Sequence, residues 1–275
     1  MAYYEQRAGA GLLVTEGTTI SEQSFGWYGV SALCTDEHEA AWKQVVDRVH
    51  AKSTKIFLQL WHMGRQSHSS SHSTNEIVSA SAIQYVGGRT RDANGQHTML
   101  ERPRALKTEE VPDVVDMYHQ CAVRAKRAGF DGVERTDKYG GSFESCYHFL
   151  HEIVEALKTM YLSGRIAMRL SPNGTYGGMD SDDNAEMFTY ALEHLSEHGL
   201  AYLAILDGFS FGRYANSRPL TVFDVKKAFK GSIMANNSYT RNTAEGVLQS
   251  GAADLVSFVR LFLSNPDLAE RFQND

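Results

Sequence analysis

The sequence predicts an α/β protein of the TIM-barrel, or (β/α)8, class. The first observation is a repeated alternation, in which apolar runs too short for helices precede segments with apolar residues at helical spacing. Such alternation predicts parallel strands joined by right-handed helical crossovers. The second observation is the length of 275 residues, 42% of them hydrophobic, which suits one barrel domain spanning residues 1–275. Seven of the eight strands of such a barrel are recognisable.

The first elements are a strand, a helix and a second strand. Residues 11–15 form a short apolar run that ends in Glu16 and Gly17. Gly17 either lets a backbone approach a ligand closely or simply allows a turn. Thr35 is a cap residue followed by acids, which marks a helix start, and the next strand begins at Ile56. The apolar face of this helix consists of Trp42, Val45, Val46 and Val49.

Residues 66–107 are polar and show little periodicity, and loops of this length tend to be functional or mobile. His68 and His72 lie there with a spacing of four residues. A metal-binding pair at that spacing needs a helix to hold it and further ligands. Serines surround the pair and no third ligand is near. We therefore predict no metal site.

From residue 108 onwards helices and strands alternate regularly. Thr108 and two acidic residues begin a helix with one apolar face, and Gly129 ends it. The expected later elements are a strand at 130–134, a helix from Phe143 to Leu157, a strand at 165–170, a helix at 184–197, a strand at 201–206, a helix at 222–229, a strand at 232–235, a helix at 244–249, a strand at 254–258 and a short closing helix.

The composition excludes several classes of protein. The net charge is −6 and there is no basic block, so we expect neither nucleic acid nor an anionic membrane as a partner. No apolar run reaches membrane-spanning length, and the first residues lack the apolar core of a signal peptide. Cys34, Cys121 and Cys146 form no CxxC pair, which argues against a disulfide framework or a structural zinc site. A reducing, cytoplasmic location fits best.

The stretch IFLQLWHMGR, from Ile56 to Arg65, is the most informative part of the sequence. It predicts a buried strand that ends at a tight turn. Gln59 is an amide inside an apolar run, and burying it costs free energy unless its hydrogen bonds are satisfied. Its partner is either the backbone or, at the carboxyl end of a barrel strand, a ligand such as a flavin pyrimidine. Trp61 is either a flat wall for a substrate ring or part of the core.

A cation and a phosphate site are predicted at the same end of the barrel. Arg169 lies within a strand and needs an anion, either Glu134 on the neighbouring strand or a flavin whose anionic reduced ring it would stabilise. The loops after strands seven and eight of such barrels often bind phosphate. Here they contain Asn237-Ser238 and Arg260, and backbone N–H groups with an arginine suit a phosphate. Pairing of Arg260 with a surface carboxylate is the alternative.

The motif FLQLWHMGR, followed by Gln-Ser-His, resembles the signature of the Old Yellow Enzyme family. These are flavin-dependent ene-reductases that include the 12-oxophytodienoate reductases. The resemblance covers nearly the whole chain. Its segments together are specific for the family, although each segment alone would be weak evidence. The other similar segments are residues 3–7, 11–18, 129–134, 135–142, 169–172 and 263–268.

The resemblance implies an enzyme that binds FMN and works in two half-reactions. NADPH gives a hydride to the flavin, which passes it to the β-carbon of an α,β-unsaturated carbonyl compound. In the family, a histidine–asparagine or histidine–histidine pair binds the carbonyl oxygen and a tyrosine supplies the proton. By position, the resemblance implies FMN contacts for Gly17, Gln59, Arg169, Asn237, Ser238, Val259 and Arg260, and a substrate-pocket wall for Trp61.

Two large segments of the family pattern are missing. The family begins earlier, with a strand carrying an Ala-Pro-Leu/Met-Thr motif, which accounts for the missing eighth strand and leaves two unpaired edges. After Glu134 the family continues with a His-Gly-Ala-Asn-Gly-Tyr-Leu type segment that carries the carbonyl-binding pair and the tyrosine. Here Glu134 runs directly into Arg135, and Tyr139 belongs to the downstream motif. The chain also stops at Asp275, before the family's C-terminal segment. The sequence therefore identifies no catalytic residue.

Smaller changes affect the phosphate loops. The family's Gly-Gly is Asn237-Ser238 here, and the glycine before the last arginine is Val259. A Cβ at such a position can clash with phosphate or disfavour positive φ, although asparagine tolerates the left-handed region better than most residues.

We expect an FMN-binding NADPH oxidoreductase of Old Yellow Enzyme type with little or no ene-reductase turnover. Loss of an aligned proton donor alone costs about 10²–10⁴ in rate. One alternative is a catalytically impaired FMN-binding remnant or interaction module from a truncated gene product. Another is a barrel lyase or isomerase that uses the phosphate loops without flavin.

Overall fold

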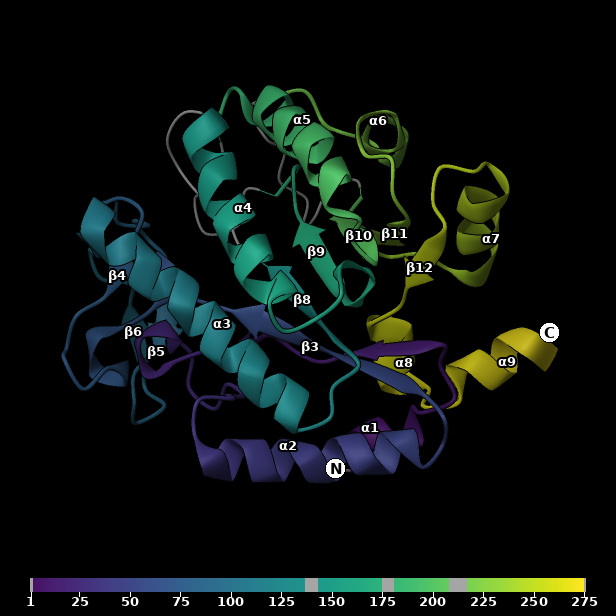
Figure 1. The fold of residues 1–275 in the computed structure, drawn as a ribbon, viewed down its shortest axis with the longest axis horizontal. Helices are drawn as coiled ribbons and strands as arrows, with labels where there is room; N and C mark the ends of the chain where they lie inside the picture. Colours follow the sequence, from purple (N-terminus) through teal and green to yellow (C-terminus); the bar gives the residue numbers. More distant parts are fainter. Residues whose placement is uncertain (1, 137–142, 175–180, 208–216, 275) are drawn as a thin grey trace.

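Parallel strands form a curved sheet at the centre of the computed structural model (Figure 1). The structure describes residues 2–136, 143–174, 181–207 and 217–274. The strand order is β1-β3-β8-β9-β10-β11-β12, and each strand is parallel to its neighbours. The bounds are β1 Leu12–Val14, β3 Lys55–Trp61, β8 Gly132–Thr136, β9 Ile166–Leu170, β10 Tyr202–Leu206, β11 Ile233–Asn236 and β12 Leu255–Ser257.

These seven strands are the ones that the sequence predicts, and the predicted fold class is confirmed. Each of these strands pairs with the next of them along the chain, as consecutive strands usually do. Among the described residues, β1 and β12 are the edges of the sheet, which curls without closing. A two-residue strand, β2 (Thr18–Thr19), also pairs with β3. That residues 1–275 form one domain stays a prediction.

Helices follow the strands and cover the outer face of the sheet (Figure 1). α2 begins after Thr35, whose side chain accepts a hydrogen bond from the His38 N–H at 3.2 Å. The turn that continues α5 ends at Gly199, where φ is 65°. Every helix in the described ranges is too short or too polar to span a lipid bilayer. The bounds are α2 Asp36–His50, α3 Val111–Arg127, α4 Phe143–Lys158, α5 Asn184–Leu195, α6 Val222–Ala228 and α7 Arg241–Gln249.

Two apolar clusters lie on opposite faces of the sheet. Leu58 and Leu60 of β3 belong to the larger cluster, which fills the space between the strands and the helices. Phe57 belongs to the smaller cluster on the concave face. Because side chains alternate along a strand, Gln59 and Trp61 share the concave face with Phe57. The smaller cluster consists of Phe57, Ala167, Tyr202, Ala204 and Met234.

The two ends of the described chain meet beside the open side of the sheet. Arg7 is buried, and its Nε and Nη2 donate to the carbonyl oxygens of Phe262 and Leu263 at 3.0 and 2.9 Å. These contacts join the segment before β1 to the helix after β12, and therefore connect the two edge strands. The elements concerned are α1 Ala2–Gln6, α8 Arg260–Ser264 and α9 Leu268–Asn274.

The polar segment after β3 contains more structure than the sequence predicts. β5 and β6 form an antiparallel hairpin, and β4 pairs with β7. His68 Nδ1 lies 2.8 Å from Ser70 Oγ, and His72 Nε2 lies 2.7 Å from Ser67 Oγ, so each histidine is bonded to a serine. The remaining elements are β4 Val78–Ser79, β5 Arg89–Arg91, β6 His97–Met99, β7 Arg104–Ala105 and the short 3₁₀ turns η1 Glu22–Ser24, η2 Gly64–Gln66, η3 Ser69–Ser71, η4 Thr108–Glu110, η5 Ser163–Arg165 and η7 Ser196–His198.

Candidate active site at the carboxyl ends of the strands

A buried carboxylate occupies the concave face of the sheet at the middle of β8, level with the first residue of β10. Glu134 of β8 lies opposite Gln59 of β3, whose Nε2 donates to Glu134 Oε1 at 2.6 Å. The Tyr202 hydroxyl of β10 donates to Glu134 Oε2 at 2.8 Å. The Gln59 N–H donates to Thr15 Oγ1 at 2.9 Å, just after β1. Four strands therefore converge on one polar cluster.

Burial controls the charge of this cluster. Burial raises the pKa of Glu134, while attraction to Arg169 and the hydrogen bonds from Gln59 and Tyr202 oppose the rise. Burial, followed by repulsion from Glu134, raises the pKa of Tyr202. Arg169 of β9 is half-buried and provides the positive charge. The structure therefore contains the Arg169–Glu134 attraction foreseen as one alternative, and it gives Gln59 a carboxylate partner where the sequence suggested backbone or flavin.

Trp61 and Gly17 touch at the rim of this region. A Cβ added to Gly17 would lie 2.4 Å from Trp61 Cε3 and 2.9 Å from Cδ2, so a larger residue would displace the indole. The Trp61 ring meets the Trp27 ring edge to face, with centroids 5.4 Å apart. Trp61 is half-buried, which leaves part of its surface for a ligand. In this structure Gly17 makes room for an aromatic wall.

The loop after β11 has the backbone that a glycine pair would adopt. φ is 115° at Asn237 and 57° at Ser238, both in the left-handed region. Asn237 Nδ2 donates to the Asp207 carbonyl oxygen at 2.7 Å, and Arg260 Nη1 donates to Ser238 Oγ at 3.2 Å. The concern that Cβ atoms would prevent positive φ is therefore unfounded for this loop. Val259 has φ of −110° and is exposed, so its backbone needs no glycine.

Side chains tie the ends of the last strands together. The Tyr239 hydroxyl donates to Asp207 Oδ2 at 2.6 Å, which links the loop after β11 to the end of β10. Asn236 Nδ2 donates to Ser257 Oγ at 2.7 Å, which links β11 to β12. These bonds hold the loop after β11, which contains Asn237, next to β12, the strand that precedes Arg260.

β8 extends beyond Glu134, at the position where the family has its carbonyl-binding segment. The strand continues to Thr136, and Arg135 turns to the outer layer, where its guanidinium lies 5.6 Å from the Tyr118 ring and 5.7 Å from the Phe149 ring. Arg135 is buried there, away from the concave face. Residues 137–142, including Tyr139, lie outside the described residues.

Comparison with known proteins identifies the family. The chain matches the model of the NADH:flavin oxidoreductase / NADH oxidase family over residues 1–134 and 134–275. The chain belongs to this family. The two matched stretches meet at Glu134, the position after which the sequence lacks the segment with the carbonyl-binding pair. A break at that position is the result that loss of an internal segment would produce.

Curated relatives and solved structures agree with this assignment. The chain is 33% identical to 12-oxophytodienoate reductase 7 of Oryza sativa subsp. japonica over 307 residues, with 98% of this chain and 78% of the relative covered. It is 34% identical to 12-oxophytodienoate reductase 2 of Arabidopsis thaliana over 298 residues, covering 99% and 79%. Both alignments are longer than this chain, so the relatives contain residues that it lacks.

Among solved structures, morphinone reductase superposes with a TM-score of 0.91 at 35% identity, with 99% of this chain and 79% of that chain covered. The old yellow enzyme homologue from Zymomonas mobilis gives a TM-score of 0.91 at 33% identity, covering 99% and 81%. The predicted membership of the Old Yellow Enzyme family is confirmed. The chain is thus a flavin-dependent oxidoreductase of that type.

Sequence reasoning missed two residues of this region. Tyr202 lies in an apolar strand where nothing in the pattern distinguishes it from a core aromatic, yet it bonds Glu134. Asp207 directly follows that strand and bonds to the loop after β11 through its backbone and its carboxylate. Its position at the carboxyl end of a predicted strand was the available signal.

Proposed function

We propose that this chain binds FMN across the carboxyl ends of β3, β9, β11 and β12 and reduces it with NADPH. The observation that carries the proposal is the left-handed backbone at Asn237 and Ser238, with Arg260 bonded to Ser238. A left-handed residue beside one of ordinary negative φ turns their N–H groups toward one point, and nests of this kind bind phosphate; Asn237 and Ser238 each have such a neighbour. The guanidinium of Arg260 adds the charge-assisted hydrogen bonds that a phosphate accepts.

Two further residues suit the flavin ring. Gln59 is oriented by its bond to Glu134, and an amide offers both a donor and an acceptor to a pyrimidine edge. The Arg169 guanidinium would stabilise negative charge on the ring. Bound FMN supplies the centre that accepts a hydride, and the residues here bind it and tune its charge.

Trp61 is proposed as a wall for the reacting rings. It stands at the end of β3, two residues after Gln59 on the same face of the strand, and it packs against Gly17. The edge-to-face contact with Trp27 fixes the orientation of the indole. Gly17 belongs to the proposed site because a side chain there would move this wall.

The proposed substrates of the second half-reaction are α,β-unsaturated carbonyl compounds, reduced at a low rate. After Glu134 this chain has Arg135 where the family has its carbonyl-binding segment, and Arg135 turns away from the concave face. Loss of an aligned proton donor costs about 10²–10⁴ in rate. A catalytically impaired FMN-binding protein is the second candidate, and the break in the family match at Glu134 favours it. We also propose a cytoplasmic location, because the three cysteines and the composition fit a reducing compartment.

An absorption spectrum tests the proposal. The purified chain is mixed with FMN, desalted and examined for a retained flavin band, and NADPH is then added without oxygen. We expect a yellow protein that bleaches on reduction; a colourless protein would contradict the cofactor assignment. Riboflavin is the matched probe, since it lacks the phosphate and should be retained much less. NADH is tested beside NADPH, because the related morphinone reductase has been solved in complex with tetrahydroNAD.

A further inference from the structure

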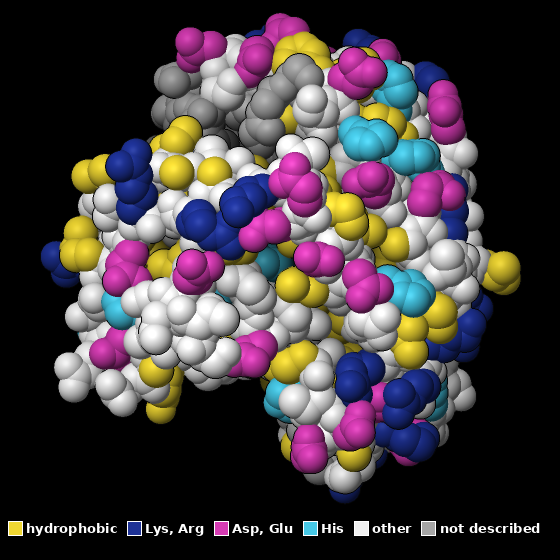
Figure 2. Space-filling view, turned by 60° about the vertical axis from the view of Figure 1, so that its left-hand side comes forward, with side chains coloured by type: hydrophobic (Ala, Val, Ile, Leu, Met, Phe, Trp, Pro, Cys, Tyr) yellow, Lys and Arg dark blue, Asp and Glu magenta, His cyan; other side chains and the backbone are white. Residues whose placement is uncertain are grey.

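Histidine and acidic side chains line a cleft between α4 and α5 on the outside of the barrel. The cleft has a volume of about 430 Å³. Figure 2 shows histidine side chains beside acidic ones in the upper part of the molecule, where α4 and α5 lie in Figure 1. The cluster of interest lies towards the C-terminal ends of these helices, and in a barrel these ends lie beside the amino ends of the next strands. The cleft is therefore separate from the proposed flavin site.

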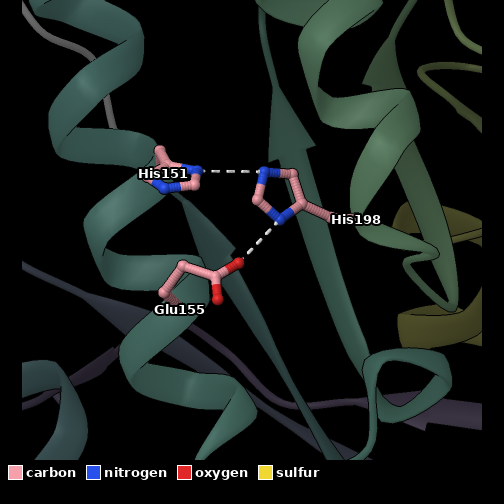
Figure 3. A group of neighbouring side chains, drawn as sticks. All are labelled: His151, Glu155 and His198. Atoms are coloured by element: carbon pink, nitrogen blue, oxygen red, sulfur yellow. Dashed lines mark hydrogen bonds and ion pairs between the residues drawn. The ribbon is translucent and has the colours of Figure 1, made fainter.

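Three possible metal ligands converge in this cleft. His151 and Glu155 are four residues apart on α4 and so project from the same face of the helix. His198 comes from η7, after α5, and points toward both of them (Figure 3). One ligand atom from each of the three residues lies within 4.8 Å of the others. His151 Nδ1 is 3.4 Å from His198 Nε2, and Glu155 Oε1 is 3.1 Å from His198 Nδ1.

The distance between Glu155 Oε1 and His198 Nδ1 is that of two ligands around one small cation. Zinc binds imidazole nitrogen and carboxylate oxygen at about 2.0–2.1 Å, which puts two ligand atoms about 2.9–3.4 Å apart for angles between a right angle and the tetrahedral one. The contact of 3.1 Å between Glu155 and His198 lies within that range. His151 lies one turn before Glu155 and contacts the other ring nitrogen of His198, Nε2, so its imidazole must turn to bind an ion held at Nδ1.

A positive charge already occupies this position. Lys158 Nζ lies 2.7 Å from Glu155 Oε1 and 2.9 Å from His198 Nδ1. The ammonium therefore contacts the two atoms that a metal ion would use. Lysine has a flexible side chain and this one is partly exposed, so it can leave the position for solvent.

The contacts on the other side of the His198 ring suit a metal ion at Nδ1. The Tyr147 hydroxyl, 2.8 Å from His198 Nε2, is placed to accept a hydrogen bond from the Nε2–H group when Nδ1 binds the ion, as outer partners of metal-bound histidines do.

We propose that His151, Glu155 and His198 bind a divalent transition-metal ion of the zinc class in place of the Lys158 ammonium. Two imidazoles and one carboxylate are ligands that zinc, copper and nickel accept, and they leave a coordination position for water or a small ligand in the cleft. Bound metal would fasten α4 to η7. The sequence pattern does not indicate this cluster, because only the tertiary fold brings His198 to the His151–Glu155 pair.

The test is a calorimetric titration of the chelator-treated, tag-free protein with Zn²⁺. We expect wild type to bind one Zn²⁺ per chain, and His151→Gln and Glu155→Gln to weaken binding at least about tenfold, since even outer partners of metal ligands are worth that much. Lys158→Met is expected to bind Zn²⁺ more tightly than wild type, because it removes the competing cation. Electron paramagnetic resonance with Cu²⁺ should show two coordinating imidazole nitrogens in wild type and one in His151→Gln.

His148→Gln is the matched control. His148 lines the same cleft but is largely exposed and contacts Glu152, so its loss should leave Zn²⁺ affinity unchanged. Circular dichroism of the metal-free variants checks that each is folded, and His151 and Glu155 are used because neither is fully buried. Absence of Zn²⁺ binding by wild type, binding unaffected by His151→Gln and Glu155→Gln, or weaker binding by Lys158→Met would each overturn the proposal.

Discussion

The ends of β11 and β8 have diverged from the family in opposite ways. After β11 the side chains differ, with Asn237-Ser238 in place of two glycines, but both residues keep positive φ. After Glu134 in β8 a whole segment is missing, and Arg135 packs in the outer layer. A backbone conformation can survive a change of side chain at a small cost in free energy. Among the described residues, no others replace the chemistry of the missing segment. We therefore expect this chain to bind the cofactor but to reduce alkenes slowly.

The largest expected effect comes from restoring the missing segment. Insertion of the corresponding segment of the rice relative between Glu134 and Arg135 should raise alkene turnover by about 10²–10⁴, because it returns an aligned proton donor. The rate of flavin reduction by NADPH should change little. Steady-state turnover of cyclohexenone measures the effect, and a Gly-Ser insert of equal length is the control. Equal gains from both inserts would show that the loop chemistry is not what limits turnover.

Removal of the Arg260 side chain tests the loop after β11, whose backbone conformation is preserved. Arg260→Ala should weaken FMN binding about 10–100-fold, since a hydrogen bond to a charged group contributes about 1.5–3 kcal/mol. Riboflavin binding should be unaffected because riboflavin has no phosphate. Fluorescence titration with both flavins measures the two affinities, and Arg91→Ala in the exposed hairpin is the control. Equal losses for both flavins would place Arg260 away from the phosphate.

Glu134→Gln tests the region at the end of β8 through the pH dependence of the free energy of unfolding. The pKa of Glu134 is raised above its ordinary value of 4.5, so its stabilising contribution is complete below that pH and is lost as pH rises through the raised value. Between the two values the loss approaches about 1.4 kcal/mol per pH unit. Wild type should therefore lose stability with rising pH more steeply than Glu134→Gln.

Urea unfolding of both proteins from pH 4.5 upwards measures this difference. Glu109→Gln, at an exposed position, should follow the wild-type profile. Parallel profiles for wild type and Glu134→Gln would contradict the raised pKa.

The smallest expected effect is a gain in stability at Ser238. Glycine adopts positive φ without the steric cost that a Cβ incurs, so Ser238→Gly should raise the free energy of unfolding by about 0.5–1 kcal/mol. Ser238→Ala keeps the Cβ and loses the same hydroxyl, so it should show no gain. Thermal or urea unfolding distinguishes the two, and a gain in both variants would mean that backbone strain is absent.

The hydrophobic pattern predicts most of the fold. All seven barrel strands lie within about two residues of the expected positions, because apolar runs bounded by glycine and acidic residues are local signals. The short pairs β4–β7 and β5–β6 were missed, since two- and three-residue strands in a polar segment show no periodicity. β8 also extends beyond Glu134, through an arginine that no strand pattern anticipates.

Those residues of the candidate site whose location depends on their position in the barrel could be predicted from the sequence. Gln59, Arg169 and Arg260 follow from strand ends and from a resemblance spread along the chain. The bonds of Glu134 to Gln59 and Tyr202 depend on register between strands far apart in sequence, as does the group of His151, Glu155 and His198. Such contacts are set by tertiary packing and leave no trace in local spacing.

The most direct test of the central claim is a rapid-mixing experiment on the FMN-loaded chain without oxygen. NADPH is added first and the loss of flavin absorbance is followed, and cyclohexenone is then mixed with the reduced protein. We predict complete reduction by NADPH and reoxidation by cyclohexenone that is about 10²–10⁴ slower than in the intact relative. Reoxidation at the relative's rate would contradict the claim that the loss after Glu134 removes the alkene chemistry, and failure to retain FMN would contradict the claim that the loop after β11 still binds phosphate.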